Sequence, residues 1–85
     1  MSLPVELHPH AHERALERGV TEPEIIATVN AGERRSAKHS RTSFRRNFAF
    51  GGVWRGRRYA TKQVEAIAVE ERGHWLVITV IAKYF

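Results

Sequence analysis

The pattern of apolar positions changes its period once along the chain, at Gly32. Before Gly32 the apolar residues recur at helical spacing, and after it they alternate with polar residues at a period of two. The first part therefore predicts two short helices joined by Gly19-Val20, and the second part predicts strands. This order favours an α+β domain, with two N-terminal helices packed on one face of a three- to four-stranded antiparallel sheet.

The first helix is expected from His8-Pro9 to about Arg18, because proline suits a first helical turn and Gly19 stands where a helix usually ends. On a helical wheel, two opposite stripes separate. The stripe expected to face the core holds Ala11, His12, Ala15 and Leu16. The opposite stripe is expected to hold His10, Arg14, Glu17 and Arg18.

The second helix is expected to begin after Thr21 and to end at Gly32. Thr21 with Glu24 three residues later has the spacing of a capping box, in which each side chain binds the backbone N–H of the other residue. The buried stripe of this helix is expected to hold Ile25, Ile26 and Val29.

The polar segments at both ends of the sheet region predict edge elements. Residues 1–7 form a short leader that either frays or pairs as an edge strand, and residues 33–40 suit an edge strand or a basic arm. The next run predicts a strand with Phe44, Phe48 and Phe50 turned inward, although Arg46 interrupts this face. The residues expected to face outward are Ser43, Arg45, Asn47 and Ala49.

Two long strands are expected to complete the sheet. Residues 57–71 form the first, and Arg72-Gly73 is the hairpin turn into the second, residues 74–84. Further turns are predicted at Gly51-Gly52 and Arg55-Gly56. On the first strand, Val64, Ala66 and Ala68 are expected to share one face. The second strand has one fully apolar face, made by Leu76, Ile78, Val80 and Ala82, and a largely apolar opposite face, so we expect it to be a central strand.

Length and composition exclude several classes of protein. The 85 residues make a single domain, residues 1–85. The chain has no cysteine, which excludes disulfides and thiolate chemistry and fits a cytoplasmic setting. No apolar run reaches membrane-spanning length and the N-terminus lacks a signal-peptide pattern, so no membrane role is expected.

Charge is concentrated in the stretch from Arg34 to Lys62. It holds ten of the fourteen basic residues and no Asp or Glu, so it carries +10 within a chain of net charge +5. Such a stretch, interleaved with aromatic residues, is typical of a surface that binds a polyanion such as RNA. The structural alternative is that the Phe residues are core and the charges a solvated face. The expected nucleic-acid-binding residues are Arg18, Arg41, Arg45, Arg46, Arg55, Arg57 and Arg58.

His10 and Arg14 are the first candidates for catalysis. RNA cleavage without a metal needs a base for the ribose 2′-OH, an acid for the leaving oxygen and positive charge on the transition state. Histidine and arginine meet these needs at neutral pH. The structural alternative is local pairing, with Arg14 or Arg18 bound to Glu17 or Glu22. The catalytic candidates are His10, Arg14, His39, Lys62 and Thr79, with Lys83 and Tyr84 as further partners.

The histidines at positions 8, 10 and 12 invite a metal interpretation. Side chains two residues apart do not share a helix face, so the three would converge only on an extended segment. Because Pro9 and Gly19 favour a helix here, we expect no metal site and no cofactor.

The run His10-Ala11-x-x-Arg14-x-x-x-Arg18-Gly19-Val20, with the later runs at residues 62–67 and 78–80, resembles a family of small bacterial domains of unknown function. That family is similar in fold to toxins of the RelE, ParE and BrnT type. The resemblance spans nearly the whole chain. It implies a small-RNase scaffold more than an activity, and for a toxin of this type an acidic antitoxin as partner. The basic middle of the chain is compatible with RNA as the ligand, either free or in the ribosome.

Three functions follow from these observations. The first is a metal-independent, toxin-type endoribonuclease that leaves a 2′,3′-cyclic phosphate. The second is a non-catalytic nucleic-acid- or ribosome-binding module that uses the same basic surface. The third is an interaction domain whose positive charges meet an acidic partner protein.

Overall fold

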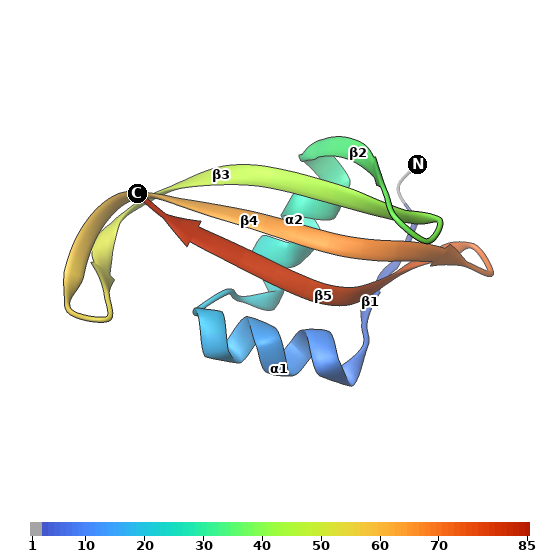
Figure 1. Ribbon diagram of the computed structural model, residues 1–85, viewed down its shortest axis with the longest axis horizontal. Helices are drawn as coiled ribbons and strands as arrows, with labels where there is room; N and C mark the ends of the chain where they lie inside the picture. The colour runs from blue at the N-terminus through green and yellow to red at the C-terminus, as the bar shows by residue number, and fades with distance from the viewer. Residues whose placement is uncertain (1–2) are drawn as a thin grey trace.

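Two helices lie on one face of a five-stranded sheet in the computed structural model, which describes residues 3–85 (Figure 1). The elements in chain order are β1 (Val5–Leu7), α1 (Pro9–Arg18), α2 (Glu22–Ala31), β2 (Glu33–Ala37), β3 (Arg41–Trp54), β4 (Arg57–Glu71) and β5 (His74–Tyr84). The α+β class and both N-terminal helices are confirmed. Among residues 3–85, no helix is long and apolar enough to cross a membrane.

The predicted helix ends are confirmed by their capping contacts. Gly19 closes α1 in the left-handed conformation, with φ +71°. Thr21 and Glu24 form both hydrogen bonds of the capping box at the start of α2. These local signals are strong because each satisfies backbone groups that a helix leaves free at its ends.

The predicted rotation of α1 is wrong. Ala11 and Ala15 are buried as expected, but His12 is exposed and Leu16 is 69% exposed. Arg18 lies on the inner side instead, where its guanidinium donates to the carbonyl of Val80 in β5. The two alanines let α1 approach β5 closely, and the Arg18 contact fixes a rotation that periodicity alone could not reveal.

The sheet has more strands than predicted, in the order β1-β5-β4-β3-β2. The leader forms β1, which pairs parallel to β5, with Val5 opposite Trp75. All other pairs are antiparallel, and β2 forms the opposite edge. The sheet is therefore five-stranded and mixed. Residues 5–7 and 33–37 form its two edge strands, which was one of the alternatives for each segment, but the parallel direction of β1 was not predicted.

The shared face of Val64, Ala66 and Ala68 on β4 is confirmed, and β5 lies inside the sheet as expected of a strand that is apolar on both faces. Val64, Ala66 and Ala68 are fully buried. A β-bulge shifts the β4–β5 register at Ile67/Ala68, so the residues of β5 that face the core change phase there. The buried residues of β5 are Trp75, Val77 and Val80, rather than Leu76 and Ile78.

The β3–β4 hairpin is longer than the turn signals predict. Gly51-Gly52 is not a turn but an irregularity inside β3, where Gly51 has φ +55°. The chain reverses at Arg55-Gly56, as predicted. β4 then runs back along β3 to the predicted turn at Arg72-Gly73. The hairpin runs along the longest dimension of the molecule, 41 Å, and its tip curves toward the helix side (Figure 1).

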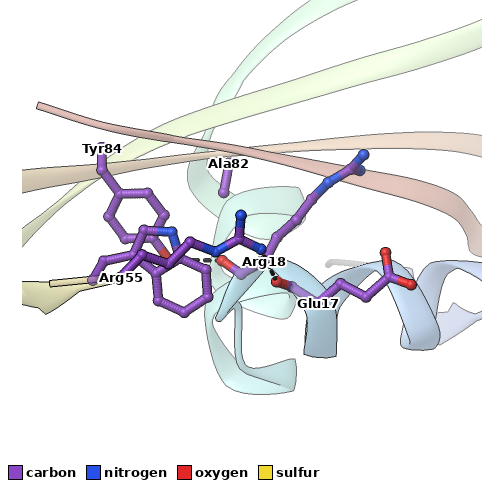
Figure 2. Close-up of a pocket in the computed structure, with 6 residues that line it drawn as sticks. Glu17, Arg18, Arg55, Ala82 and Tyr84 are labelled. Atoms are coloured by element: carbon purple, nitrogen blue, oxygen red, sulfur yellow. Dashed lines mark hydrogen bonds between the residues drawn. The ribbon is translucent and has the colours of Figure 1, made fainter.

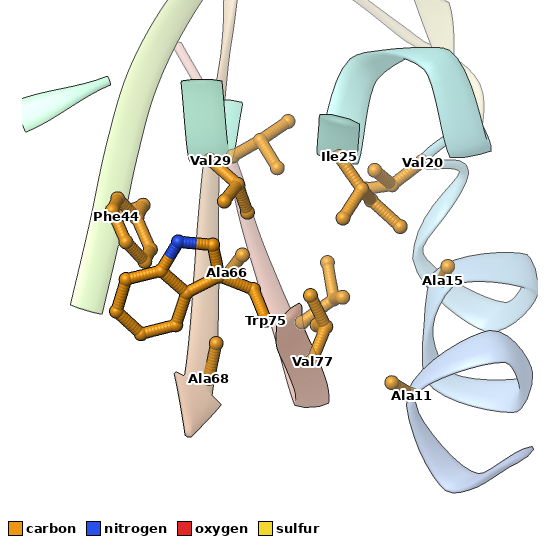
Figure 3. Close-up of a cluster of buried hydrophobic side chains, with 12 residues drawn as sticks. Ala11, Ala15, Val20, Ile25, Val29, Phe44, Ala66, Ala68, Trp75 and Val77 are labelled. Atoms are coloured by element: carbon orange, nitrogen blue, oxygen red, sulfur yellow. The ribbon is translucent and has the colours of Figure 1, made fainter. Parts of the chain in front are cut away.

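The core lies between the helices and the inner face of the sheet (Figure 3). Phe44 is buried, as predicted, and packs edge-on against Trp75 with ring centroids 5.0 Å apart. Phe48 packs against the edge of this cluster, and Phe50 belongs to an aromatic group nearer the hairpin tip. Among residues 3–85, no helix covers the opposite face of the sheet (Figure 1).

Candidate nucleic-acid interface

The C-terminal end of α1 is held by three side chains from the β3–β4 hairpin and β5. Lys62 Nζ donates to the carbonyl of Gly19 at 3.0 Å, and the Tyr84 hydroxyl donates to that of Arg18 at 2.7 Å. Arg55 Nη2 donates to the carbonyl of Glu17 at 3.2 Å. These carbonyls lie at the negative end of the helix, where cationic donors are favourable. The hairpin and β5 thus complete the end of the first helix.

Lys62 is a buried cation with an acidic partner. Its residue exposure is only 4%, and its ammonium lies 2.8 Å from Glu24 Oε1 and 5.3 Å from the Phe50 ring. Burial acts to raise the pKa of Glu24, but hydrogen bonds from Lys62 and from the Thr21 backbone outweigh it and hold that pKa below its usual value of 4.5. The pair ties β4 to the start of α2.

Tyr84 is the centre of an aromatic cluster beside these contacts. Trp54 stacks on it at 5.0 Å with an interplanar angle of 14°, and Phe50 and Tyr59 lie at 5.3 and 5.7 Å. Burial, reinforced by the charge of Glu24, raises the pKa of Tyr84 although Arg55 opposes the shift. The hydroxyl therefore stays protonated at neutral pH and serves as a donor.

The hairpin tip rests on Gly19. A Cβ atom at this position would lie 2.5 Å from Cζ3 of Trp54 and 2.9 Å from the Tyr84 hydroxyl, so only glycine admits this approach. The Arg55 guanidinium lies over the Trp54 ring, 5.1 Å from its centroid. The contacts of Trp54 with Gly19, Tyr84 and Arg55 hold the tip, and the arginines it carries, in a defined position.

A cleft of about 280 Å³ opens between α1, the tip and β5 (Figure 2). It is lined by Glu17, Arg18, Trp54, Arg55, Ala82 and Tyr84. The Glu17 carboxylate is bound by Arg14 at 2.7 Å and points away from Arg55. Within residues 3–85, Arg18 and Arg55 form no salt bridge, so the cleft carries uncompensated positive charge.

The basic stretch is not one continuous surface. Lys38, His39 and Arg41 lie at the β2–β3 turn, whereas Arg57 and Arg58 follow the turn at the other end of β3. Because β3 has fourteen residues, at about 3.3 Å each, most of the molecular length separates the two groups.

The basic residues between these ends are engaged with the protein itself. Arg34 covers the rings of Trp75 and Phe44 at 5.1 and 5.8 Å. Arg46 lies over Phe48 at 5.1 Å and donates to the Ala27 carbonyl at 3.4 Å. Arg45 is half-buried and lies 3.9 Å from a Glu33 oxygen. The exposed arginines that lack an acidic partner therefore include two end groups: Arg55, Arg57 and Arg58 at the hairpin tip, and Arg41 and Arg72 at the opposite end.

The predicted catalytic residues are not brought together. His10 is exposed near the start of α1, about 12 Å along the helix from Arg18. Arg14 pairs with Glu17, which was the structural alternative. His39 lies in the β2–β3 turn with φ +61°, and Thr79 follows the bulge of β5, on the side of the sheet without helices. Lys62 lies next to the cleft, at the Gly19 carbonyl, and Tyr84, a further predicted partner, lines the cleft itself.

No pair of predicted catalytic residues forms a hydrogen bond in the described part of the chain. Residues 3–85 also contain no group of three or more histidines and carboxylates arranged to hold a metal ion.

Sequence reasoning overlooked Glu24 as the partner of Lys62, and Trp54 as the residue that seats the tip. The need for an acidic partner of Lys62 could have been predicted from the sequence. Alternation along β4 places Lys62 on the same face as Val64, Ala66 and Ala68, and a lysine on a buried face needs an acidic partner. The role of Trp54 could not have been predicted, because Trp54 and Gly19 are in contact although they lie far apart in the sequence.

Comparison with protein-family models, with curated proteins and with solved structures gave no match. The fold of two helices and a mixed five-stranded sheet is compatible with a RelE-like arrangement. The resemblance to the small bacterial domain family therefore rests only on the sequence runs named above, at residues 10–20, 62–67 and 78–80.

Proposed function

We propose that the protein is a small RNA-binding domain, and that the hairpin tip and the adjacent cleft form its contact surface. The observation that carries the proposal is the group of arginines without carboxylate partners at this end: Arg18, Arg55, Arg57 and Arg58. Guanidinium groups bind phosphates in bidentate fashion, and several together give an affinity that depends on salt.

The tip is suited to this role because its arginines are ordered before any ligand binds. Arg55 is stacked on Trp54, and Arg57 lies 5.9 Å from the Tyr59 ring. Arg58 donates to the Gly51 carbonyl at 3.4 Å. Ordering these long side chains in advance lowers the entropy lost on binding. The edges of the half-buried Trp54 and Tyr59 supply apolar contact for bases.

The test is a fluorescence-anisotropy titration with single-stranded RNA of about 12 nucleotides, a length typical of one small binding domain. The variant reverses two exposed tip charges, Arg57→Glu and Arg58→Glu. The matched control reverses two exposed charges elsewhere, Arg35→Glu and Arg72→Glu. We expect the tip variant to lose more than about tenfold in affinity and the control to lose less than about threefold. Equal losses, or no binding by the parent chain, contradict the proposal.

The second candidate is a metal-independent endoribonuclease of the toxin type. It is favoured by the exposure of His10 on α1, one helical turn before Arg14, and by the order of two helices before the sheet. The enzyme would cleave RNA in buffer with EDTA and leave a 2′,3′-cyclic phosphate end. Cleavage that His10→Ala abolishes supports it, and RNA left intact at saturating binding contradicts it.

An acidic antitoxin is the partner that this second candidate requires, and it would compete with RNA for the same basic tip. Expression of an active toxin alone would arrest growth, whereas the His10→Ala chain would be harmless. Equal harmlessness of both chains contradicts the toxin hypothesis but leaves RNA binding by the tip open to its own test.

A further inference from the structure

The face of the sheet opposite the helices is uncovered and carries an aliphatic strip. Register pairs place Val69 beside Leu76, and Ile67 shares their side of the sheet. Two residues separate the buried Val77 and Val80, so the bulge directs Ile78 to this side as well. Ile81 continues the strip and is 37% exposed. An aliphatic strip of this kind on a solvent-facing sheet indicates an interaction surface.

Several polar residues of this open face are already paired with one another. Ser43 donates to Glu65 at 2.6 Å, and Gln63 donates to Asn47 at 2.9 Å. Glu33 accepts from Arg35 at 2.9 Å. Covering the face would therefore leave few of these groups without a hydrogen bond, which keeps the free-energy cost of burying them low.

The open face is also close to neutral, although the chain carries +5. By strand alternation its carboxylates are Glu6, Glu33, Glu65 and Glu71. By the same alternation its basic residues are Arg35, Arg41, Arg45, Lys83 and, at the hairpin tip, Arg57. A polyanion or an acidic protein gains little net attraction here. A second copy of the same chain meets both signs and is repelled less here than by any basic end.

The size of the face is near that required for a stable interface. Four strands about 4.8 Å apart over about 30 Å of length present on the order of 600 Å² of sheet. Standard interfaces bury about 800 Å² of accessible surface on each partner, and side chains add to the planar area.

We propose that this open face is a self-association surface, on which a second copy packs sheet against sheet about a two-fold axis. The aliphatic strips of both copies meet at the centre, and the charged residues at the rim meet partners of opposite sign. The RNA-contacting tips stay free at the ends of such a dimer, so the inference stands independently of RNA binding.

The test is the mass of the RNA-free protein by sedimentation equilibrium across about 1 μM to 1 mM, a range that detects weak and tight dimers. The parent chain is expected to reach twice 9.8 kDa. Ile81→Glu is expected to remain at 9.8 kDa. The matched control, Leu16→Glu, changes a more exposed aliphatic residue on α1 and is expected to dimerise like the parent.

A parent chain that remains monomeric at every concentration overturns the proposal, as does a dimer that Leu16→Glu dissociates and Ile81→Glu does not. Far-UV circular dichroism establishes that each variant is folded. A second measurement needs no variant: amide hydrogen exchange of the parent chain at Ile67, Val69 and Leu76 is expected to slow as concentration rises. Exchange that is independent of concentration in a dimeric sample places the interface elsewhere.

Discussion

Lys62 Nζ lies 2.8 Å from Glu24 Oε1 and 3.0 Å from the carbonyl of Gly19, so one buried cation joins β4 to both helices. The ends of α1 and α2 approach each other at this point, and neither the carboxylate nor the carbonyl has another cationic partner among the described contacts. The aromatic cluster and the hairpin tip are built on the same end of α1. The contacts of Lys62 therefore help to hold in place the end of α1 on which the hairpin tip packs.

Replacing Lys62 by methionine is expected to lower the free energy of unfolding by about 2 kcal/mol, because Glu24 loses its cation and Gly19 loses a capping donor. Urea unfolding measures the change. Lys83→Met, which removes an exposed cation from the next strand, is the control and is expected to change stability by less than about 0.5 kcal/mol. The double variant Lys62→Met/Glu24→Leu should recover part of the loss. Equal small effects of both lysine changes would show that the buried pair is not stabilising.

Stability is expected to depend on pH through Glu24. Because its pKa in the folded protein is held below the usual 4.5, its contribution to stability is fully present above that value. The contribution is lost as the pH falls through the lowered pKa, because the unfolded chain takes up the proton first. Unfolding measured from neutral to acidic pH should therefore show a steeper acid loss in the parent chain than in Glu24→Gln. Parallel profiles would contradict this assignment.

Gly19→Ala is expected to be more damaging than alanine at other glycines of positive φ. Gly19 has φ +71° and lies against Trp54, whereas Gly56 has φ +83° with open space around it. Backbone strain costs each variant about 1–2 kcal/mol, and displacement of the tip should add at least about 1 kcal/mol at Gly19. Urea unfolding and the tryptophan emission maximum measure both effects. Equal losses at the two positions, with unchanged emission, would mean that Trp54 does not rest on Gly19.

His10→Ala is expected to leave RNA affinity and stability unchanged, since the side chain is exposed and lies at the far end of α1 from the cleft. Anisotropy and urea unfolding are the measurements. A change within about 0.5 kcal/mol in each agrees with the proposed surface. A large loss of affinity would move the RNA site toward the start of α1.

The sequence predicts well those features that depend on local chemistry. Helix ends at Gly19 and Thr21 and the turn at Arg72-Gly73 follow from capping and turn residues, and the buried side of β4 follows from simple alternation. The rotation of α1 could not be predicted, because the Arg18 contact to Val80 joins residues far apart in the chain.

The bulge in β5 and the parallel pairing of β1 could not be predicted either, because each depends on the neighbouring strand and not on the residues of the segment alone. For the site, the sequence identifies the basic stretch, and its role as a binding surface stays a prediction. The length of β3 places the two parts of this stretch at opposite ends of the molecule. Lys62 is buried because it pairs with Glu24, which comes from a distant segment.

The most direct test of the RNA-binding proposal is the salt dependence of affinity. If Arg18, Arg55, Arg57 and Arg58 each neutralise one phosphate of a single strand, the slope of log K against log salt concentration should be about −2.8. Arg57→Gln with Arg58→Gln should reduce it to about −1.4, while Arg35→Gln with Arg72→Gln leaves it unchanged. A parent slope near zero, or one that the tip variant does not alter, would contradict the proposed surface.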